Sequence, residues 1–505
     1  MRPTAPSTST RRLASVSCII IVSLGLLALM RNRPQRPSTA GEHIARRFSH
    51  LSRHDPLPYQ DSLDLELGRC PTTHAQSNQD QLRGDGETFW KTVETEELAR
   101  ANQRIIERVT ATLEERGMDS LSGNGQRGLV FTAGNGDTLS RLLVSLRILR
   151  HEHRCELPVE IFGFKDELEA SDPRSERVRR EIDEMGQITW RPVIEIERAR
   201  GAWKQFHIKG EAIASSRFSE ILYLDSDNIA VTDPTYLFDS PLYKRHGVVF
   251  WPDFNRDSAA NPIWRLLDVP CDPVKSWQIE SGQLLIDKRA RDGLNAVAVQ
   301  IAKEMNRNHE FWYRLSGGDK DTFRYAFYFL DLPFTLAPHF PSSVGTVLPR
   351  QQAYDDGHVF CGHTMLQFGL SSSDWQLDGY QKLHSSNVSK TEGVVARAPD
   401  KSGHAPPLFV HANLLKYSGS WNQRGSTFET IKRPREDEIA KSELDQIRQS
   451  GFSVRGICSD VWSVDRELEG SGGQVELFEF ATSFEGVLSG FEEMYWEAGG
   501  RAGGY

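Results

Sequence analysis

Residues 220–231, with the sequence EILYLDSDNIAV, constrain the fold of this chain more than any other segment. The apolar and aromatic run 221–224 is typical of a strand that is buried on both faces. Two carboxylates, Asp225 and Asp227, follow this run at once, with one residue between them. In an open α/β sheet, ligands bind just beyond the carboxyl ends of the strands. The segment therefore predicts an α/β fold with a pair of carboxylates at the edge where a ligand binds.

The close spacing of the two aspartates indicates a metal site. Like charges this near to each other are repulsive unless a cation is shared between them, and oxygen ligands suit Mg²⁺ or Mn²⁺. Asp225 and Asp227 are therefore candidates for holding a metal-bridged diphosphate. The alternative is simple turn chemistry, because Asp, Ser and Asn all hydrogen-bond to the nearby backbone. The triplet alone leaves both interpretations open.

A second strand signal, at residues 128–132, is followed by a turn that contains glycines and then by leucines at helical spacing. Glycine lets backbone N–H groups approach a ligand, and a helix N-terminus favours phosphate or ribose oxygens. Thr132 and Gly134 are therefore candidate nucleotide-binding residues. The turn half-matches the dinucleotide fingerprint G-x-G-x-x-G, but its third glycine is missing, so a dehydrogenase is disfavoured.

A histidine and two lysines complement the aspartates chemically. In the segment 409–416, an apolar pair precedes His411, and Lys416 comes five residues later. A neutral imidazole is a common metal ligand, and a lysine is a point charge for phosphate. Lys209 lies in a helical pattern just upstream of the aspartates. The alternatives are a structural histidine and surface lysines.

Three polar residues lie beside glycines at the predicted ends of elements. Glu280 and Gln283 flank Gly282 before a predicted strand at 284–286, and Asp319 follows a glycine pair before a predicted helix. Glycine at such places allows close approach of a ligand, so all three are candidates for contacting a sugar. Asp319 and Asp321 are alternatively ordinary N-terminal residues of the helix.

The segment 223–228 resembles the Asp-x-Asp segment of glycosyltransferases that use nucleotide sugars. In chain order, residues 128–162, 204–233, 278–287, 317–325 and 409–416 together resemble the fungal Golgi α-mannosyltransferase family, which builds α-1,2 and α-1,3 mannose branches on glycoproteins. The resemblance implies a GT-A-like catalytic domain that transfers mannose from GDP-mannose to a mannose-containing acceptor with retention of configuration. It implies Mn²⁺, or another divalent metal, held by Asp225, Asp227 and His411. The donor-binding candidates are Thr132, Gly134, Lys209, Asp225 and Lys416, and the catalytic candidates are Asp319, Glu280 and Gln283.

Two other functions remain open. A glycogenin-like transferase that uses a UDP-sugar would carry the same carboxylates and histidine. An inactive, carbohydrate-binding member would keep the fold and lose the metal, which the intact Asp225, Asp227 and His411 disfavour. Fold alone does not determine the substrate.

The chain has 505 residues, which exceeds the roughly 250 to 300 at which a single core stops growing. Residues 13–30 carry no charge and are flanked by arginines, so we expect a retained transmembrane anchor, with a cleaved signal peptide as the alternative. The resemblance implies a type II Golgi membrane protein with a lumenal catalytic domain. We expect a cytoplasmic tail at 1–12, a stem at 31–86, a catalytic domain at 87–430 and a C-terminal extension of unknown role at 431–505.

Composition adds several narrower expectations. The net charge is −9 and the central region has no basic stripe, so no nucleic-acid partner is expected. Of the six cysteines, one lies in the predicted anchor, so at most two disulfides form within the chain. The spacing of His358, Cys361 and His363 matches no zinc template, and a structural role is expected there. The aromatic segment 251–254 with Trp264 is either an acceptor pocket or plain packing. Asn387 lies in a glycosylation sequon within a predicted insertion.

Overall fold

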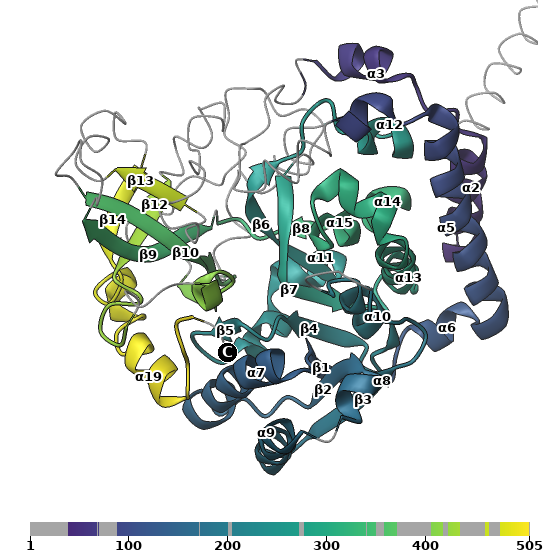
Figure 1. Ribbon diagram of the computed structural model, residues 1–505. Helices are drawn as coiled ribbons and strands as arrows, with labels where there is room; N and C mark the ends of the chain where they lie inside the picture. Colours follow the sequence, from purple (N-terminus) through teal and green to yellow (C-terminus); the bar gives the residue numbers. More distant parts are fainter. Residues whose placement is uncertain are drawn as a thin grey trace, which may run out of the picture. The chain divides into compact units, whose positions relative to one another are not determined.

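The computed structural model describes residues 39–67, 69, 88–170, 172–199, 205–271, 277–339, 341–349, 358–370, 406–417, 423–434, 460–463 and 475–503. The chain divides into two compact units, residues 1–45 and 46–505, and the second unit carries the sheets and the site (Figure 1). The predicted anchor at 13–30 and Asn387 lie outside the described residues. In the described part of the chain, no helix combines the length and the apolar character that crossing a membrane requires.

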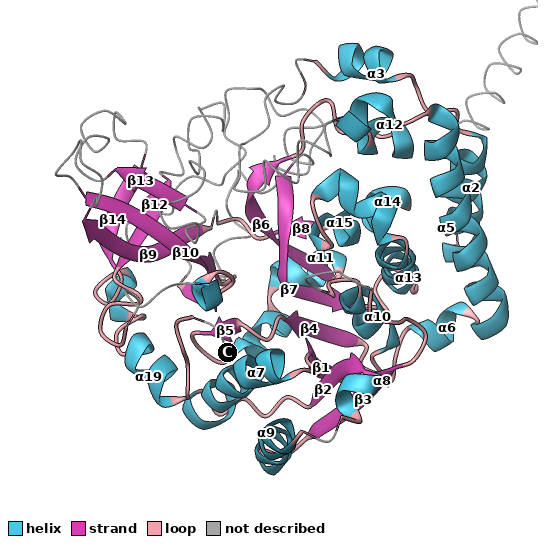
Figure 2. Ribbon diagram, in the orientation of Figure 1, coloured by secondary structure: helices cyan, strands magenta, loops and turns pink. Residues whose placement is uncertain are grey.

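A mixed sheet with the strand order β3-β2-β1-β4-β7-β6-β8 forms the centre of the second unit (Figure 2). Strand β1 is parallel to β2 and β4, β2 is parallel to β3, and β7 is antiparallel to both β4 and β6. The bounds are β1 Arg127–Thr132, β2 Val159–Phe164, β3 Ile188–Val193, β4 Glu220–Leu224, β6 Val248–Arg256, β7 Trp277–Asp287 and β8 Thr335–Leu336. The α/β fold that the sequence predicts is confirmed.

The predicted strands form because their apolar runs can be covered on both faces. All four residues from Ile221 to Leu224 are fully buried, as are Leu129 and Phe131 in β1. Helix α10 contacts β1 and α13, and α15 contacts β7 and α13. The helices are α2 Ala40–Arg53, α3 Tyr59–Glu66, α5 Thr95–Arg116, α6 Met118–Leu121, α7 Gly136–Arg147, α8 Lys165–Leu168, α9 Pro173–Glu184, α10 Ile208–Ser215, α11 Pro241–His246, α12 Ile263–Leu267, α13 Leu294–Arg307, α14 His309–Ser316, α15 Lys320–Phe329 and α19 Phe491–Glu497.

A second sheet is antiparallel throughout and follows the order β14-β12-β9-β10-β11-β5, with β13 paired to β10. Its first strand in the sequence, β5, begins directly after Asp227, so the two sheets are joined at the carboxylate pair. The bounds are β5 Asn228–Ala230, β9 Ser342–Pro349, β10 His358–Phe368, β11 Pro407–His411, β12 Thr430–Pro434, β13 Asp460–Ser463 and β14 Val475–Glu479.

The domain boundary that we expected at 431 falls inside β12, which pairs with β9 on one side and β14 on the other. Residues from the expected extension also belong to one hydrophobic cluster with α7: Phe480, Phe491 and Tyr495 pack in the same core as Val144. The described residues after 431 are thus an integral part of the second unit, because their aromatic side chains complete its core.

The stem expectation is also corrected in part. Residues 46–53 of α2 and the helix α3 lie in the second unit, upstream of Glu87, where we expected folded structure to begin. Arg47 donates hydrogen bonds to the Leu267 carbonyl at 2.6 Å and to the Phe329 carbonyl at 2.8 Å. The Phe48 ring lies edge-on against Phe329. The sequence gives little signal for this packing, because the apolar residues of α2 and α3 are few and are separated by many polar residues.

Strand β6 is longer than the sequence predicts, and burial decides between the two interpretations of the aromatic segment 251–254 with Trp264. The 251–254 segment is part of β6, and Trp251 and Trp264 are almost completely buried, so their rings are packed inside and not presented to a sugar. Trp251 donates a hydrogen bond to the Phe368 carbonyl at 2.8 Å. Plain packing is the correct interpretation of these two tryptophans.

The His358, Cys361 and His363 cluster lies in β10 and has structural bonds where the side chains are described. Cys361 is disulfide-bonded, as is Cys271, while Cys155 is a free, buried thiol. The ring of His363 is fully buried, with one nitrogen 2.9 Å from the Thr364 hydroxyl and the other 3.0 Å from the Thr427 carbonyl. Cys361 and His363 therefore have the structural roles that the sequence predicts.

Candidate functional site

Strand pairing brings three distant segments to the end of β4. Leu224, the last residue of β4, pairs with Gln283 of β7, and the Asp225 amide donates to the Gly282 carbonyl at 2.9 Å. On the other side, Asn228 of β5 lies opposite His411 of β11. The Asp225–Asp227 pair is therefore flanked by β7 and β11, and no local sequence pattern dictates that arrangement.

Asp225, Asp227 and His411 form a cluster that can hold a metal. Each offers one ligand atom, and these three atoms lie within 4.8 Å of one another. His411 Nε2 is 3.3 Å from Asp227 Oδ1 and 3.9 Å from Asp225 Oδ2. Two carboxylate oxygens and one imidazole nitrogen form a donor set that suits Mn²⁺-class cations. The three residues thus fit the divalent metal that the resemblance implies.

The ring of His411 packs against Gly282 of β7. A Cβ atom on Gly282 would lie 2.6 Å from His411 Nδ1, so only glycine leaves room for the ring at this point of β7. The buried Nδ1 atom has no hydrogen-bond partner among the described residues and lies 3.6 Å from Glu280 Oε1. Burial alone would lower the pKa of the His411 imidazole, but the facing carboxylates of Asp227 and Glu280 outweigh it and raise that pKa.

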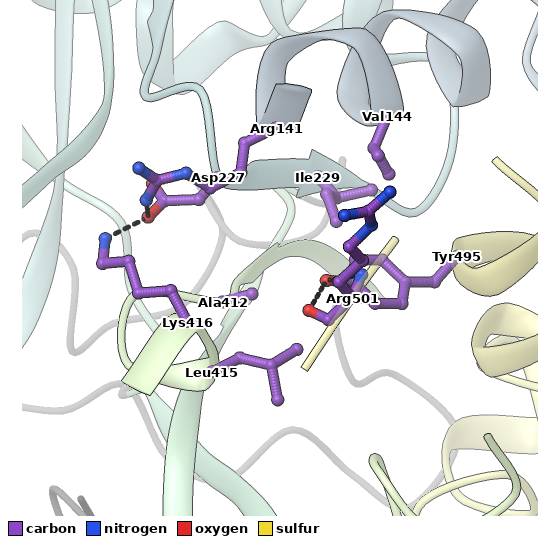
Figure 3. Close-up of a pocket in the computed structure, with 9 residues that line it drawn as sticks. All are labelled: Arg141, Val144, Asp227, Ile229, Ala412, Leu415, Lys416, Tyr495 and Arg501. Carbon is purple, nitrogen blue, oxygen red and sulfur yellow. Dashed lines mark hydrogen bonds and ion pairs between the residues drawn. The ribbon is translucent and has the colours of Figure 1, made fainter. Parts of the chain in front are cut away.

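Two cations hold the second carboxylate of the pair. Asp227 Oδ2 lies 2.6 Å from Lys416 Nζ and 3.2 Å from Arg141 Nη1 (Figure 3). Burial would raise the pKa of the Asp227 carboxyl, but the charges of Lys416, His411 and Arg141 hold it well below its ordinary value. Lys416, a candidate from the sequence, thus lies beside Asp227. The sequence reasoning missed Arg141, whose one signal is a basic residue in the helix that follows the glycine turn.

A third cation, Lys209 on α10, holds the first carboxylate. Its Nζ lies 3.2 Å from Asp225 Oδ2, 2.9 Å from Asp319 Oδ2 and 2.9 Å from the Ser281 hydroxyl. Burial would lower the pKa of the ammonium group, but the two carboxylates outweigh it and raise that pKa. The structure therefore brings Lys209 and Asp319, which were separate candidates, together with Asp225, and it adds Ser281.

The glycine turn lies next to the same cluster. The Thr132 and Tyr223 hydroxyls are 2.8 Å apart, and the Tyr223 hydroxyl donates to Asp225 Oδ1 at 2.7 Å. Gly134 approaches its neighbours closely, because a Cβ there would lie 2.4 Å from Glu167 Oε2. Thr132 is thereby linked to the aspartate pair through one tyrosine, whereas Gly134 borders Glu167.

Of the two candidates on β7, Glu280 and Gln283, only Glu280 lies beside His411 of the candidate metal cluster. Glu280 Oε1 accepts from the Gly282 amide at 2.7 Å, and burial raises the pKa of its carboxyl group against the opposing effect of His411. Gln283 is fully buried: it accepts from the Asn228 side chain at 2.6 Å and donates to Gln367. Both ends of the Gln283 amide are thus engaged in holding β5 and β10 beside β7. The sequence places these residues before a strand, but the structure places them within one.

Asp321, which the sequence analysis left beside Asp319, belongs to a separate buried network. Its Oδ1 accepts from the Ile279 amide at 3.1 Å and from Arg324 Nε at 3.0 Å. Burial raises the pKa of Asp321 to about 7, with Arg324 opposing the shift. Asp321 therefore attaches α15 to β7. Of the two aspartates, Asp319 and Asp321, only Asp319 contacts Lys209 beside Asp225.

The central part of the chain matches a known protein family. Residues 126–266 and 271–369 match the model of the Mannosyl_trans3 family, described as "Mannosyltransferase putative". The alpha-1,2-mannosyltransferase MNN24 of Candida albicans is 26% identical over 340 residues, covering 57% of this chain and 46% of that protein. The alpha-1,2-mannosyltransferase MNN2 of Saccharomyces cerevisiae is 24% identical over 388 residues, covering 64% of this chain and 61% of that protein. The chain spans about half the length of MNN24.

Similar solved structures include the bifunctional glycosyltransferase WbbM in its apo form, with 15% identity and a TM-score of 0.30, covering 43% of this chain and 39% of that chain. An active-site mutant of LgtC has 17% identity and a TM-score of 0.27, covering 40% of this chain and 70% of that chain. At these TM-scores the likeness carries no weight for this chain.

The family match covers all strands of the central sheet and extends to the end of β10 in the second sheet, and it includes Asp225, Asp227, Lys209 and Glu280. His411 and Lys416 lie beyond it, but strand pairing brings them to the same carboxylates. The family resemblance inferred from the sequence is thus confirmed for the central part of the chain, which matches the mannosyltransferase family.

Proposed function

We propose that this protein is an α-1,2-mannosyltransferase that moves mannose from GDP-mannose to a mannose-containing acceptor in protein glycosylation. The observation that carries the proposal is the Asp225, Asp227 and His411 cluster at the end of a central strand, in a chain whose central part matches the mannosyltransferase family. The names of the relatives support mannose as the transferred sugar and the α-1,2 linkage. The GDP donor and the GT-A-like description of the fold rest on the family resemblance.

The cations around the aspartates would bind the donor's diphosphate. Lys416 and Arg141 both lie against Asp227, within reach of a phosphate placed beside that carboxylate. Ammonium and guanidinium groups both bind phosphate oxygens through charge-assisted hydrogen bonds. When bound by Asp225, Asp227 and His411, a divalent metal would supply further positive charge to stabilise the departing diphosphate. Thr132, Gly134 and Asp225 are proposed to contact the nucleoside.

The transfer exchanges one bond at the anomeric carbon for another. The bond to the diphosphate oxygen breaks, a bond to an acceptor hydroxyl oxygen forms, and the acceptor's proton is released. Retention of configuration requires either a covalent intermediate or departure and attack on one face of the sugar. We propose Glu280 and Asp319 as the carboxylates that act at this carbon. Gln283, with both ends of its amide engaged, is proposed to act by holding Glu280 and Gly282 in place.

The test is a transfer assay on the full chain with GDP-mannose, a panel of UDP-sugars, Mn²⁺ and an α-mannoside acceptor. We expect transfer from GDP-mannose, lowered about a hundredfold or more in Asp227→Asn and His411→Ala, as for the loss of one stabilising group at a transition state. Asp239→Asn is the control, because Asp239 is an exposed carboxylate paired with Arg127. Transfer from a UDP-sugar alone would replace the donor assignment with the UDP-dependent alternative. Carbohydrate binding without any transfer would favour the inactive alternative.

We further propose a type II Golgi membrane protein, with residues 13–30 as its anchor and the catalytic unit in the lumen. The disulfide bonding of Cys271 and Cys361 supports an oxidising compartment. In intact microsomes, the region after Gly86 should survive external protease and be digested once detergent is added. Digestion in intact microsomes would contradict the lumenal orientation.

A further inference from the structure

The hydroxyl group of Tyr223 connects the aspartate pair to the end of strand β1. Tyr223 lies in β4, two residues before Asp225, and is fully buried. Its hydroxyl donates to Asp225 Oδ1 at 2.7 Å and lies 2.8 Å from the Thr132 hydroxyl, at the carboxyl end of β1. Strands β1 and β4 are parallel, with Val130 opposite Tyr223. The pairing of these strands therefore determines which hydroxyl the tyrosine meets.

The two oxygens of the Asp225 carboxylate have different partners. Oδ1 accepts from Tyr223, whereas Oδ2 lies 3.2 Å from Lys209 Nζ and 3.9 Å from His411 Nε2. The terminal torsion of an aspartate side chain has a broad energy minimum, so hydrogen bonds decide how the plane of the carboxylate is turned. Because Oδ1 is held by Tyr223, Oδ2 is the oxygen directed toward His411. Tyr223 thus determines which oxygen Asp225 presents to the candidate metal cluster.

The chemistry of the three groups determines the direction of both hydrogen bonds. The Asp225 carboxylate, paired with the Lys209 ammonium group, has no hydrogen to donate, so the Tyr223 hydroxyl donates its one hydrogen to it. The hydrogen of the other bond must then come from Thr132, whose hydroxyl donates to the Tyr223 oxygen. The half-buried Thr132 oxygen keeps its lone pairs. It can therefore accept a hydrogen bond from a ligand, and it has no hydrogen left for a phosphate oxygen.

We propose that Tyr223 is a positioning residue for both the metal and the donor. It orients the Asp225 carboxylate for a divalent cation, and it orients the Thr132 hydroxyl to accept from a hydroxyl of the donor's ribose. A ribose hydroxyl can donate the hydrogen that the Thr132 oxygen requires, and the ribose adjoins the diphosphate within a nucleotide. This inference rests on the proposed function, because the metal and the nucleotide are those of that reaction.

The first test is a calorimetric titration of the full chain with Mn²⁺ alone. Tyr223→Phe keeps the buried ring, whose centre lies 5.3 Å from Lys209 Nζ, and removes the hydroxyl. We expect its Mn²⁺ affinity to fall at least about tenfold, as is typical when a group that orients a metal ligand is lost. Tyr243→Phe is the matched control. Tyr243 is also buried, and its hydroxyl donates at 3.2 Å to Glu220, at the opposite end of β4, so its loss should leave Mn²⁺ affinity unchanged.

The second test addresses the ribose contact, and it decides the inference if Tyr223→Phe does not fold. Thr132→Val keeps the shape of the side chain and removes its hydroxyl. In the presence of Mn²⁺, the wild type should bind either 2′-deoxy-GDP or 3′-deoxy-GDP about fivefold more weakly than GDP, as expected for one neutral hydrogen bond. Thr132→Val should bind all three nucleotides with the same affinity, because the acceptor of that hydrogen bond is gone.

The outcomes separate this inference from the proposed function. If the wild type binds Mn²⁺ and Tyr223→Phe binds it equally well, the role of Tyr223 is wrong and the proposed function stands. If removing a ribose hydroxyl has no effect on the wild type, or the same effect on Thr132→Val, the ribose contact is wrong. If Tyr223→Phe loses Mn²⁺ affinity but the wild type transfers no mannose, the role of Tyr223 is supported and the proposed function falls. If the wild type binds no Mn²⁺, this inference is overturned, and a transfer assay without metal decides the function.

Discussion

At the scale of single residues, Lys209 is the side chain that connects most of the candidate site. Its ammonium group contacts Asp225 from β4, Asp319 from the start of α15 and Ser281 from β7. The lysine is buried, so these charges interact with little screening by solvent. One lysine therefore neutralises two carboxylates that would otherwise face each other.

Replacing this lysine should destabilise the fold strongly. In Lys209→Met, the buried Asp319 loses its partner, and breaking such a pair costs about 3 kcal/mol of unfolding free energy. The double variant Lys209→Met/Asp319→Asn should recover part of the loss, because the unpaired charge is then removed as well. Urea unfolding measures both effects. Lys244→Met is the control, since Lys244 pairs with Asp239 on the exposed surface, and a midpoint for Lys209→Met equal to this control would contradict the prediction.

The buried ring of His363 predicts a pH dependence of stability. Burial lowers the pKa of His363 from 6.5 to about 4, against the opposing hydrogen bond to Thr427. The neutral ring therefore stabilises the folded state fully above pH 6.5, and this contribution is lost as the pH falls from 6.5 to about 4. The loss amounts to roughly 3 kcal/mol.

Unfolding free energies between about pH 4 and 7 check this expectation. His363→Gln removes the titrating group, so its stability should fall less steeply over this range than that of the wild type. Equal slopes in the two proteins would show that another group causes the pH dependence.

At the scale of elements, the site depends on how β7 and β11 flank the end of β4. Strand β11 pairs with β5 so that His411 lies opposite Asn228, next to Asp227. Strand β7 carries the glycine against which the histidine ring packs. The two strands fix the imidazole from two directions, without any ligand.

Gly282→Ala tests this arrangement. The added methyl group would lie 2.6 Å from the His411 ring, so the ring must move away from the aspartates. We expect transfer activity to fall at least about tenfold, while overpacking costs roughly 1 to 3 kcal/mol of stability. Gly41→Ala is the matched control, because a Cβ at Gly41 meets no atom within 4 Å. Wild-type activity with an unchanged Mn²⁺ dependence in Gly282→Ala would show that the histidine is not a ligand.

At the scale of the whole molecule, residues 475–503, here called the C-terminal segment, are built into the second unit. Besides its aromatic contribution to the core, it carries Glu492, whose carboxylate accepts hydrogen bonds from three backbone amides. These are Gly425 at 2.7 Å, Thr427 at 3.0 Å and Phe428 at 3.1 Å. One side chain of α19 thereby holds the turn that leads into β12.

Removing the Glu492 carboxylate should destabilise the turn that leads into β12. Glu492→Ala leaves three amides without their acceptor and should cost about 2 kcal/mol, because hydrogen bonds to a charged group are the stronger ones. Glu493→Ala, at the exposed neighbouring position, should change stability by less than about 0.5 kcal/mol. Hydrogen exchange of the 425–428 amides provides a local measurement. If these amides in Glu492→Ala were as protected from hydrogen exchange as in the wild type, the role given to Glu492 would be wrong.

Much of the first sheet is predictable from the sequence because its signals are local. The buried strands β1, β2 and β4 are short apolar runs that end at polar or glycine residues, and helix α7 follows from the spacing of its leucines. A local signal also predicts the position of Asp225 and Asp227. The apolar run stops at these two carboxylates, which indicates that the strand ends there and that they lie at the edge where a ligand is expected. The roles expected of Lys209, His411 and Lys416 came from their chemistry and from the family resemblance.

Tertiary structure decided which side chains meet. Lys416 lies 189 residues from Asp227 in the sequence, and only the pairing of β5 with β11 brings them within 2.6 Å. The same long-range pairing buried Gln283 between two strands, and packing of residues 475–503 brought Tyr495 into the same core as Val144. The spacing of apolar residues along a segment indicates which of its side chains are buried, because burial depends on the polarity of each side chain. It does not indicate which distant segment they contact, because that depends on how the whole chain folds.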